Sequence, residues 1–235
     1  MAFYSEGDLD SLVEGLKDLR TGALLEILSV VMLIVAFIPL FTMFPTPDVM
    51  GRETMPPLGL MITQALLILA LVFIAVALSI VSFYKFYKAA SHFKDYDPSR
   101  LGIGKTGVTL TIIAIVILIV SLLVMMGAIS SMAPSSGLRM AENLLLGTFT
   151  SMIFVMLIAA ILALVGSILF GIMIMRLGEV EGLEPGFRTA GIIYIVSIVI
   201  SLIPFIAVVG FVLSLVSLIL IYSYSGSSLK ALGAY

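Results

Sequence analysis

The residues with the clearest chemical signature in this sequence are Gly-Ile-Gly-Lys-Thr at positions 102–106, which match the end of a phosphate-binding loop. The complete loop needs a glycine at the position of Ser99 and a β-strand before it. Here a proline-containing loop precedes the match and an apolar run follows it. We therefore favour a flexible entry to a membrane span, in which Lys105 meets lipid phosphate, over nucleotide binding.

Two further polar residues lie inside apolar runs. Glu26 is the only carboxylate predicted to lie within hydrocarbon, where an ionisable group is a functional hypothesis by default, for example as one step of a proton path. Because Glu26 lies about one helical turn beyond Gly22, near the predicted interface, we favour a solvated or Arg-paired structural carboxylate. Gln64 would line a polar route or, as we favour, hydrogen-bond across a helix interface.

The sequence contains one histidine, His92, and no cysteine. Histidine titrates near neutral pH, so a pH-sensing role is one interpretation, and a surface histidine is the one we favour. Disulfides, thiolate nucleophiles and multi-histidine metal sites are excluded. No membrane-embedded His or Asp is available to activate a serine, and no second buried acid accompanies Glu26. We therefore predict a protein that is not an enzyme and has no catalytic, cofactor or metal site.

The composition places the chain in a membrane. It is 61% hydrophobic and 11% charged, whereas charged residues make up about 25% of soluble domains. Apolar runs of at least about 18 residues recur, and their continuity favours transmembrane helices over the alternating strands of a barrel. With a net charge of −2, nucleic acid is not an expected partner. The scarcity of Asn, Gln and Cys is typical of a thermophile.

We predict an all-α, polytopic transmembrane bundle of six spans, with five as the alternative. The ambiguity comes from the last apolar run, 189–224, which as one helix would be about 54 Å long, far beyond a hydrocarbon core of about 30 Å. Pro204 and Gly210 favour its division into two short spans. The predicted single bundle covers 23–226, followed by a short cytoplasmic tail at 227–235. The six spans are about 23–44, 58–84, 107–132, 144–175, 187–203 and 206–224.

The first 22 residues are predicted to form a cytoplasmic amphipathic helix at the interface. Apolar residues recur there at helical spacing, with the charges on the opposite face. The segment is too acidic to be held by anionic lipid, so we expect it to dock on protein. The apolar positions are Leu9, Leu12, Val13, Leu16 and Leu19.

A basic loop between the second and third predicted spans sets the orientation. Lys and Arg flanking a span are retained on the cytoplasmic side. With six spans ten of the twelve basic residues fall on the side of this loop, and with five spans nine do. Either count predicts a multi-pass protein of the plasma membrane with a cytoplasmic N-terminus. The C-terminus is cytoplasmic as well if there are six spans. The basic residues of the loop, which would contact lipid headgroups, are Lys85, Lys88, Lys94, Arg100 and Lys105.

Small residues recur every four positions in the fourth predicted span: Ala159, Ala163, Ser167 and Gly171. Such a ridge lets two membrane helices approach closely. With few buried polar groups beside it, the ridge favours a non-catalytic structural or accessory subunit that packs against other membrane proteins or itself, and contacts membrane lipids. The alternative is a transporter or channel for a small solute or ion, which would use Glu26 or Gln64.

Three stretches together resemble an uncharacterised archaeal family of multi-spanning membrane proteins, domain of unknown function 973. They are GLKDLRTGALLEILSV at 15–30, DPSRLGIGKTGV at 97–108 and the apolar tail from 186 to 222. The resemblance implies an archaeal host and a helical bundle. It implies no activity and no functional residues.

Overall fold

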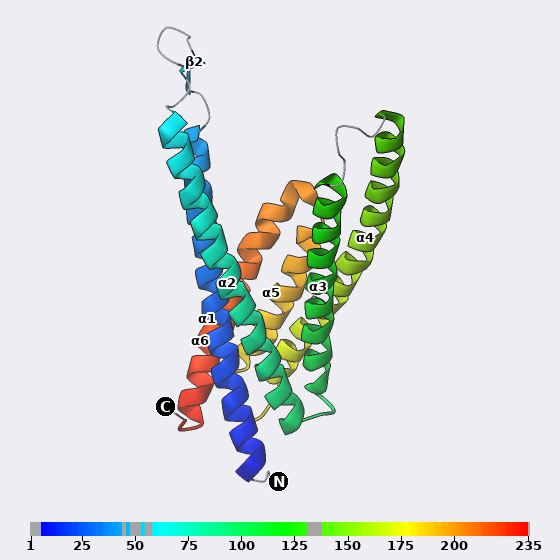
Figure 1. Cartoon of the computed structure of the whole chain (residues 1–235). Coiled ribbons are helices and arrows are strands. Elements are labelled where there is room, and N and C mark those ends of the chain that lie inside the picture. The colour runs from blue at the N-terminus through cyan, green and yellow to red at the C-terminus, as the bar shows by residue number, and fades with distance from the viewer. Residues whose placement is uncertain (1–5, 44–45, 48–52, 55–57, 131–137, 235) are drawn as a thin grey trace.

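The computed structural model describes residues 6–43, 46–47, 53–54, 58–130 and 138–234, and the structural statements below refer to this part of the chain. It is helical apart from one short antiparallel pair of strands (Figure 1). The elements are α1 (Glu6–Met43), β1 (Thr46–Pro47), β2 (Glu53–Thr54), α2 (Leu58–Tyr96), α3 (Gly102–Ser130), α4 (Leu138–Leu177), α5 (Gly186–Ser201), the 3₁₀ helix η1 (Pro204–Ile206) and α6 (Ala207–Ala231).

The predicted all-α membrane bundle is confirmed. Helices α1 to α4 and α6 are long and apolar enough to cross a membrane, and α5 is a shorter apolar helix of 16 residues. At 1.5 Å per residue α5 is about 24 Å long, somewhat less than a hydrocarbon core. The predicted division of the last apolar run is also confirmed, because α5 ends at Ser201 and η1 begins at Pro204. Proline lacks the N–H that a continuous helix requires.

The N-terminal amphipathic segment is helical, but the prediction that it forms a separate helix is wrong. Helix α1 is continuous from Glu6 to Met43, since no proline interrupts the sequence between the charged segment and the apolar one. The expected docking on protein is confirmed, because Leu12, Leu16 and Leu19 are fully buried. The charged segment and the apolar segment are therefore two parts of one helix.

The six helices form one closed ring in chain order. Each helix contacts the next one along the chain, and α6 returns to contact α1. Both termini lie at the same end as the α2–α3 and α4–α5 connections (Figure 1). We call this end the base and the opposite end the open end. From the base towards the open end, the α1–α2 hairpin and the α3–α4 hairpin diverge (Figure 1).

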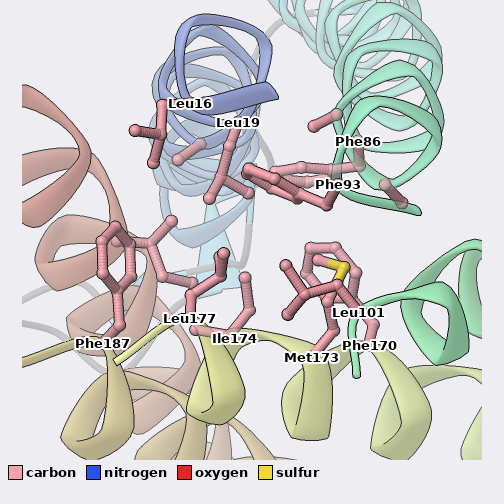
Figure 2. Close-up of a cluster of buried hydrophobic side chains, with 14 of the residues drawn as sticks. Leu16, Leu19, Phe86, Phe93, Leu101, Phe170, Met173, Ile174, Leu177 and Phe187 are labelled. Atoms are coloured by element: carbon pink, nitrogen blue, oxygen red, sulfur yellow. The ribbon is translucent and has the colours of Figure 1, made fainter. Parts of the chain in front are cut away.

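Side-chain burial is concentrated at the base. A single cluster of buried apolar residues draws on all six helices, and Figure 2 shows side chains from α1, α2 and α4 meeting there. Towards the open end large apolar side chains are exposed, as for Phe73, which is 75% exposed. The base is therefore the packed part of the ring. Its fully buried larger members include Leu16, Leu19, Phe93, Leu101, Met173, Ile174, Leu177 and Phe187.

Helices α3 and α4 touch through their backbones. A Cβ atom added to Gly107 would lie 2.6 Å from the carbonyl oxygen of Gly166, and one added to Gly166 would lie 2.6 Å from the carbonyl oxygen of Gly107. Within the predicted small-residue ridge, Ala159 is fully buried and Gly171 packs against Ile195 of α5. At these positions the small residues serve contacts within the chain.

This contact predicts the effect of a single methyl group. Gly107→Ala should lower the free energy of unfolding by about 1–3 kcal/mol, because α3 and α4 must separate to accommodate it. Gly127→Ala on the same helix, where nothing lies within 4 Å of an added Cβ, should be neutral or stabilising by up to about 1 kcal/mol. Unfolding of the purified protein in detergent measures both. Equal stability of the two variants would contradict the close approach.

Candidate functional site

A small, mostly apolar pocket with a few polar side chains lies at the centre of the ring, and every one of the six helices contributes to its lining. Its cavity volume is about 120 Å³. Four apolar residues that line it also belong to the buried cluster of the base, so the packed base forms its floor. These are Phe86, Val108, Phe170 and Leu218. The polar lining residues are Glu26, Thr111, Ser167, Tyr194 and Ser214.

Glu26 of α1 carries the only charge of the pocket lining. Its Oε1 accepts a hydrogen bond from Ser79 Oγ of α2 at 3.4 Å. Ser82 Oγ also lies near the carboxylate but donates to the Gly22 carbonyl at 2.9 Å. The other oxygen, Oε2, is buried and has no hydrogen-bond partner among the described residues. A buried carboxylate oxygen without a partner is costly, so a proton, water or cation is needed to satisfy it.

Tyr194 of α5 lies across the pocket. Its hydroxyl lies near the Ser167 side chain of α4 and within electrostatic range of Glu26. The ring packs edge-on against Phe170 at a centroid separation of 5.7 Å, which fixes its orientation. Thr111 of α3 donates its hydroxyl hydrogen to the Gly107 carbonyl at 3.1 Å, which leaves its oxygen lone pairs as acceptors. The polar side-chain atoms of the lining are thus all oxygens.

The size and charge of the pocket limit what it can hold. Sites for drug-sized ligands measure about 300–1,000 Å³, whereas a water molecule occupies about 30 Å³ of liquid. The pocket therefore has room for a few waters or a small ion. Within the described residues no three His, Cys, Asp or Glu side chains gather as a metal-binding group. One carboxylate among hydroxyl oxygens suits a hard cation of low charge, or a proton.

The basic residues that the sequence singled out all lie at the base, outside this pocket. Lys85 Nζ is 2.7 Å from Asp18 Oδ1, and Lys88 Nζ is 3.5 Å from Asp18 Oδ2. Because Asp18 is buried, this pairing links α1 to α2. Lys94 is exposed at the end of α2. Lys105 Nζ lies 5.5 Å from the centroid of the Tyr87 ring.

Arg100 and His92 are also at the base. Arg100 is exposed, and its carbonyl oxygen accepts a hydrogen bond of 2.8 Å from Arg176 Nη1. The interpretation of His92 as a surface residue is wrong, because its side chain is only 20% exposed. Its Nε2 lies 3.3 Å from Glu14 Oε2 and 3.8 Å from Asp18 Oδ2. The imidazole belongs to the polar contact between α1 and α2.

Two other candidates from the sequence do not reach the pocket. Gln64 is half-buried on α2 towards the open end and does not line it. The segment 102–106 forms the first turn of α3, so the expected flexible entry to the span is wrong. Among the described residues a helix and a turn precede it, and not the β-strand that a phosphate-binding loop requires. Gly104 in this turn lies directly against Met173 of α4. The turn is therefore part of the packed base.

Sequence reasoning missed Thr111 and Tyr194 as site residues. Each is a single polar side chain within an apolar run, and such runs do not show which helix face points inward. The available signal was Tyr194 itself, a polar ring well inside a predicted span. The sequence singled out Ser167 only as a member of the small-residue ridge, whereas Ser167 and Ser214 both line the pocket.

A family model described as "Protein of unknown function (DUF973)" matches residues 12–232. The chain therefore belongs to this family, as the resemblance of the three stretches indicated. No curated protein and no solved structure matches the chain. The family description names no activity, so the function has to be argued from the pocket and the ring.

The ion pairs at the base generate a prediction of stability. Asp18→Asn should lower the free energy of unfolding by about 1–2 kcal/mol, less than a fully buried pair would lose because Lys85 remains partly exposed. Asp10→Asn, at an exposed position of the same helix, is the matched control and should change stability by less than about 0.5 kcal/mol. Unfolding in detergent compares the two. Equal effects would show that Asp18 does not link α1 to α2.

Proposed function

We propose that this protein is a transporter or channel for a small cation or proton, with Glu26 as the residue that binds it. The observation that carries the proposal is the unpartnered Oε2 of Glu26 in a pocket lined by all six helices. Ionisable groups within membrane spans mark ion and proton pathways. The volume of the pocket favours an ion or a few waters over a larger solute.

The geometry supports access from one side at a time. The fully buried side chains at the base separate Glu26 from the end that carries the termini. Towards the open end the α1–α2 and α3–α4 hairpins diverge (Figure 1). Passage of an ion would require a second conformation in which the basal side chains separate. Movement of one hairpin against the others is the kind of rearrangement by which transporters alternate access.

We also propose a non-catalytic role in the plasma membrane with the base in the cytoplasm. His92 is engaged with Glu14 and Asp18 at the base, so it is not placed to act on a substrate beside Glu26. The clustering of basic residues at the base supports its cytoplasmic location. Both termini would then be cytoplasmic. The archaeal host and the thermophilic character stay predictions from the sequence.

A second candidate function is the accessory subunit that the sequence favoured. The observation in its favour is the extent of exposed apolar surface near the α5–α6 connection, where Phe205 is 98% exposed and Val208 is 75% exposed. Another membrane protein, or a second copy of this chain, would contact these side chains between the diverging hairpins. Such a subunit would not require an ion at Glu26.

Ion flux through purified protein in liposomes tests the leading proposal. Imposed gradients of H⁺, Na⁺ and K⁺ should reveal protein-dependent flux of at least one of the three. Glu26→Gln should reduce that flux by about tenfold to a hundredfold, the factor that corresponds to the loss of one contact to a charged group. Asp10→Asn is the control, because Asp10 is exposed on the same helix at the base and takes no part in the ion pairs described above, and its flux should equal that of the unmodified protein.

The two candidates give different outcomes. Absence of flux for all three ions, or undiminished flux in a folded Glu26→Gln variant, would contradict the role of Glu26. Co-purification of a stoichiometric membrane partner together with absent flux would favour the accessory subunit.

A further inference from the structure

A second cavity lies on the membrane-facing side of the ring, between α2 and α3. Of the neighbouring helix pairs that form the ring, α2 and α3 contact each other least. The gap between them has a cavity volume of about 460 Å³, within the range of ligand sites. We call it the α2–α3 groove. It is lined by Ile80, Phe83, Tyr84, Tyr87, Thr109, Ile112, Ile113, Ile115 and Val116.

The groove is apolar along its length and has a positive charge at its basal end. Lys105 Nζ lies 5.5 Å from the centroid of Tyr87, which lines the groove. No acidic residue of the described chain forms an ion pair with Lys105, whereas Lys85 and Lys88 are both engaged by Asp18. Tyrosines and a lysine at this level are typical of the boundary between hydrocarbon and headgroups. The charge therefore remains available to a ligand.

We propose that the α2–α3 groove binds one acyl chain of an anionic membrane lipid, whose headgroup phosphate contacts Lys105. The wall from Thr109 to Val116 spans about 10 Å along α3, about a third of a hydrocarbon core, so the groove holds the part of the chain next to the headgroup. A gap lined by apolar side chains and open to the bilayer is filled by lipid. The cationic end selects an anionic headgroup.

The groove adjoins the central pocket through one side chain. Phe83 lines both cavities, so its ring lies between the lipid site and Glu26. A chain in the groove packs against the outer side of this ring and supports the wall of the pocket. This lipid site stands on the geometry of α2 and α3 and does not depend on ion transport.

Tryptophan fluorescence provides the test, because the chain contains no tryptophan. A Val116→Trp reporter lies in the groove, and an Ile161→Trp reporter on α4 is the matched control. Both native side chains are 52% exposed, and Ile161 lines neither cavity. Each protein is placed in vesicles of zwitterionic lipid, into which either a brominated anionic lipid or a brominated zwitterionic lipid is titrated as quencher.

We expect half-quenching of the reporter at 116 to require a fraction of brominated anionic lipid about fivefold lower than the fraction of brominated zwitterionic lipid. This factor corresponds to the attraction of one lysine near the membrane surface for an anionic lipid. The reporter at 161 should respond equally to both lipids. Lys105→Gln should abolish the preference at 116, and Lys94→Gln, at an exposed basal lysine, should retain it. Equal quenching at 116 by both lipids, or a preference that survives Lys105→Gln in folded protein, would overturn the proposal.

Discussion

Close contact between helix backbones holds α3 to α6 together on one side of the Glu26 pocket. At Gly107, Gly191 and Gly210, an added Cβ would lie 2.6–2.7 Å from a backbone oxygen of a neighbouring helix. These contacts join α3 to α4, α5 to α4, and α6 to α5. Within hydrocarbon the hydrophobic effect does not drive helices together, so van der Waals contact and interhelical hydrogen bonds have to do so. Short interhelical distances also explain why the central pocket is small.

The α1–α2 pair is joined by hydroxyl groups. Ser29 Oγ donates to the Ala75 carbonyl and Ser82 Oγ donates to the Gly22 carbonyl, both at 2.9 Å and both between α1 and α2. Glu26 lies between these two contacts along α1, and one of its oxygens is taken up by the same group of serines. The other oxygen is buried and has no hydrogen-bond partner among the described residues. The contacts that join α1 to α2 thus also hold Glu26 in the lining of the pocket.

Local signals in the sequence explain where two of the helices end. Asp97 followed by Pro98 ends α2, and Pro204 divides the last apolar run, because proline acts on the backbone next to it. The identity of the pocket residues could not be predicted in this way. In a membrane both faces of a helix are apolar, so hydrophobic periodicity does not reveal the rotation of a helix that brings Thr111 and Tyr194 towards Glu26. The sequence marked Glu26 as a candidate and favoured a solvated or Arg-paired structural carboxylate, and this role stays a prediction.

The same limit applies to helix packing. The small-residue ridge on α4 drew attention to Gly171 and Ser167, yet the backbone contact with α3 is made by Gly166, which lies between two members of the ridge. A pattern of every fourth residue describes one face only, whereas α4 is in contact with α3 and α5 on different faces. The ridge suggested a partner outside the chain, whereas Ala159 and Gly171 of the ridge make contacts within the chain.

The central claim is that Glu26 lies in a pocket closed towards the base by packed side chains. Its most direct test is a Glu26→Cys variant, which places a single thiol in a chain without cysteine. In sealed vesicles of known orientation, a membrane-impermeant thiol reagent is added from either side and the modification rate is measured. We expect the thiol to react from the side of the open end and to be protected from the side of the termini. Faster reaction from the side of the termini would contradict the closed base.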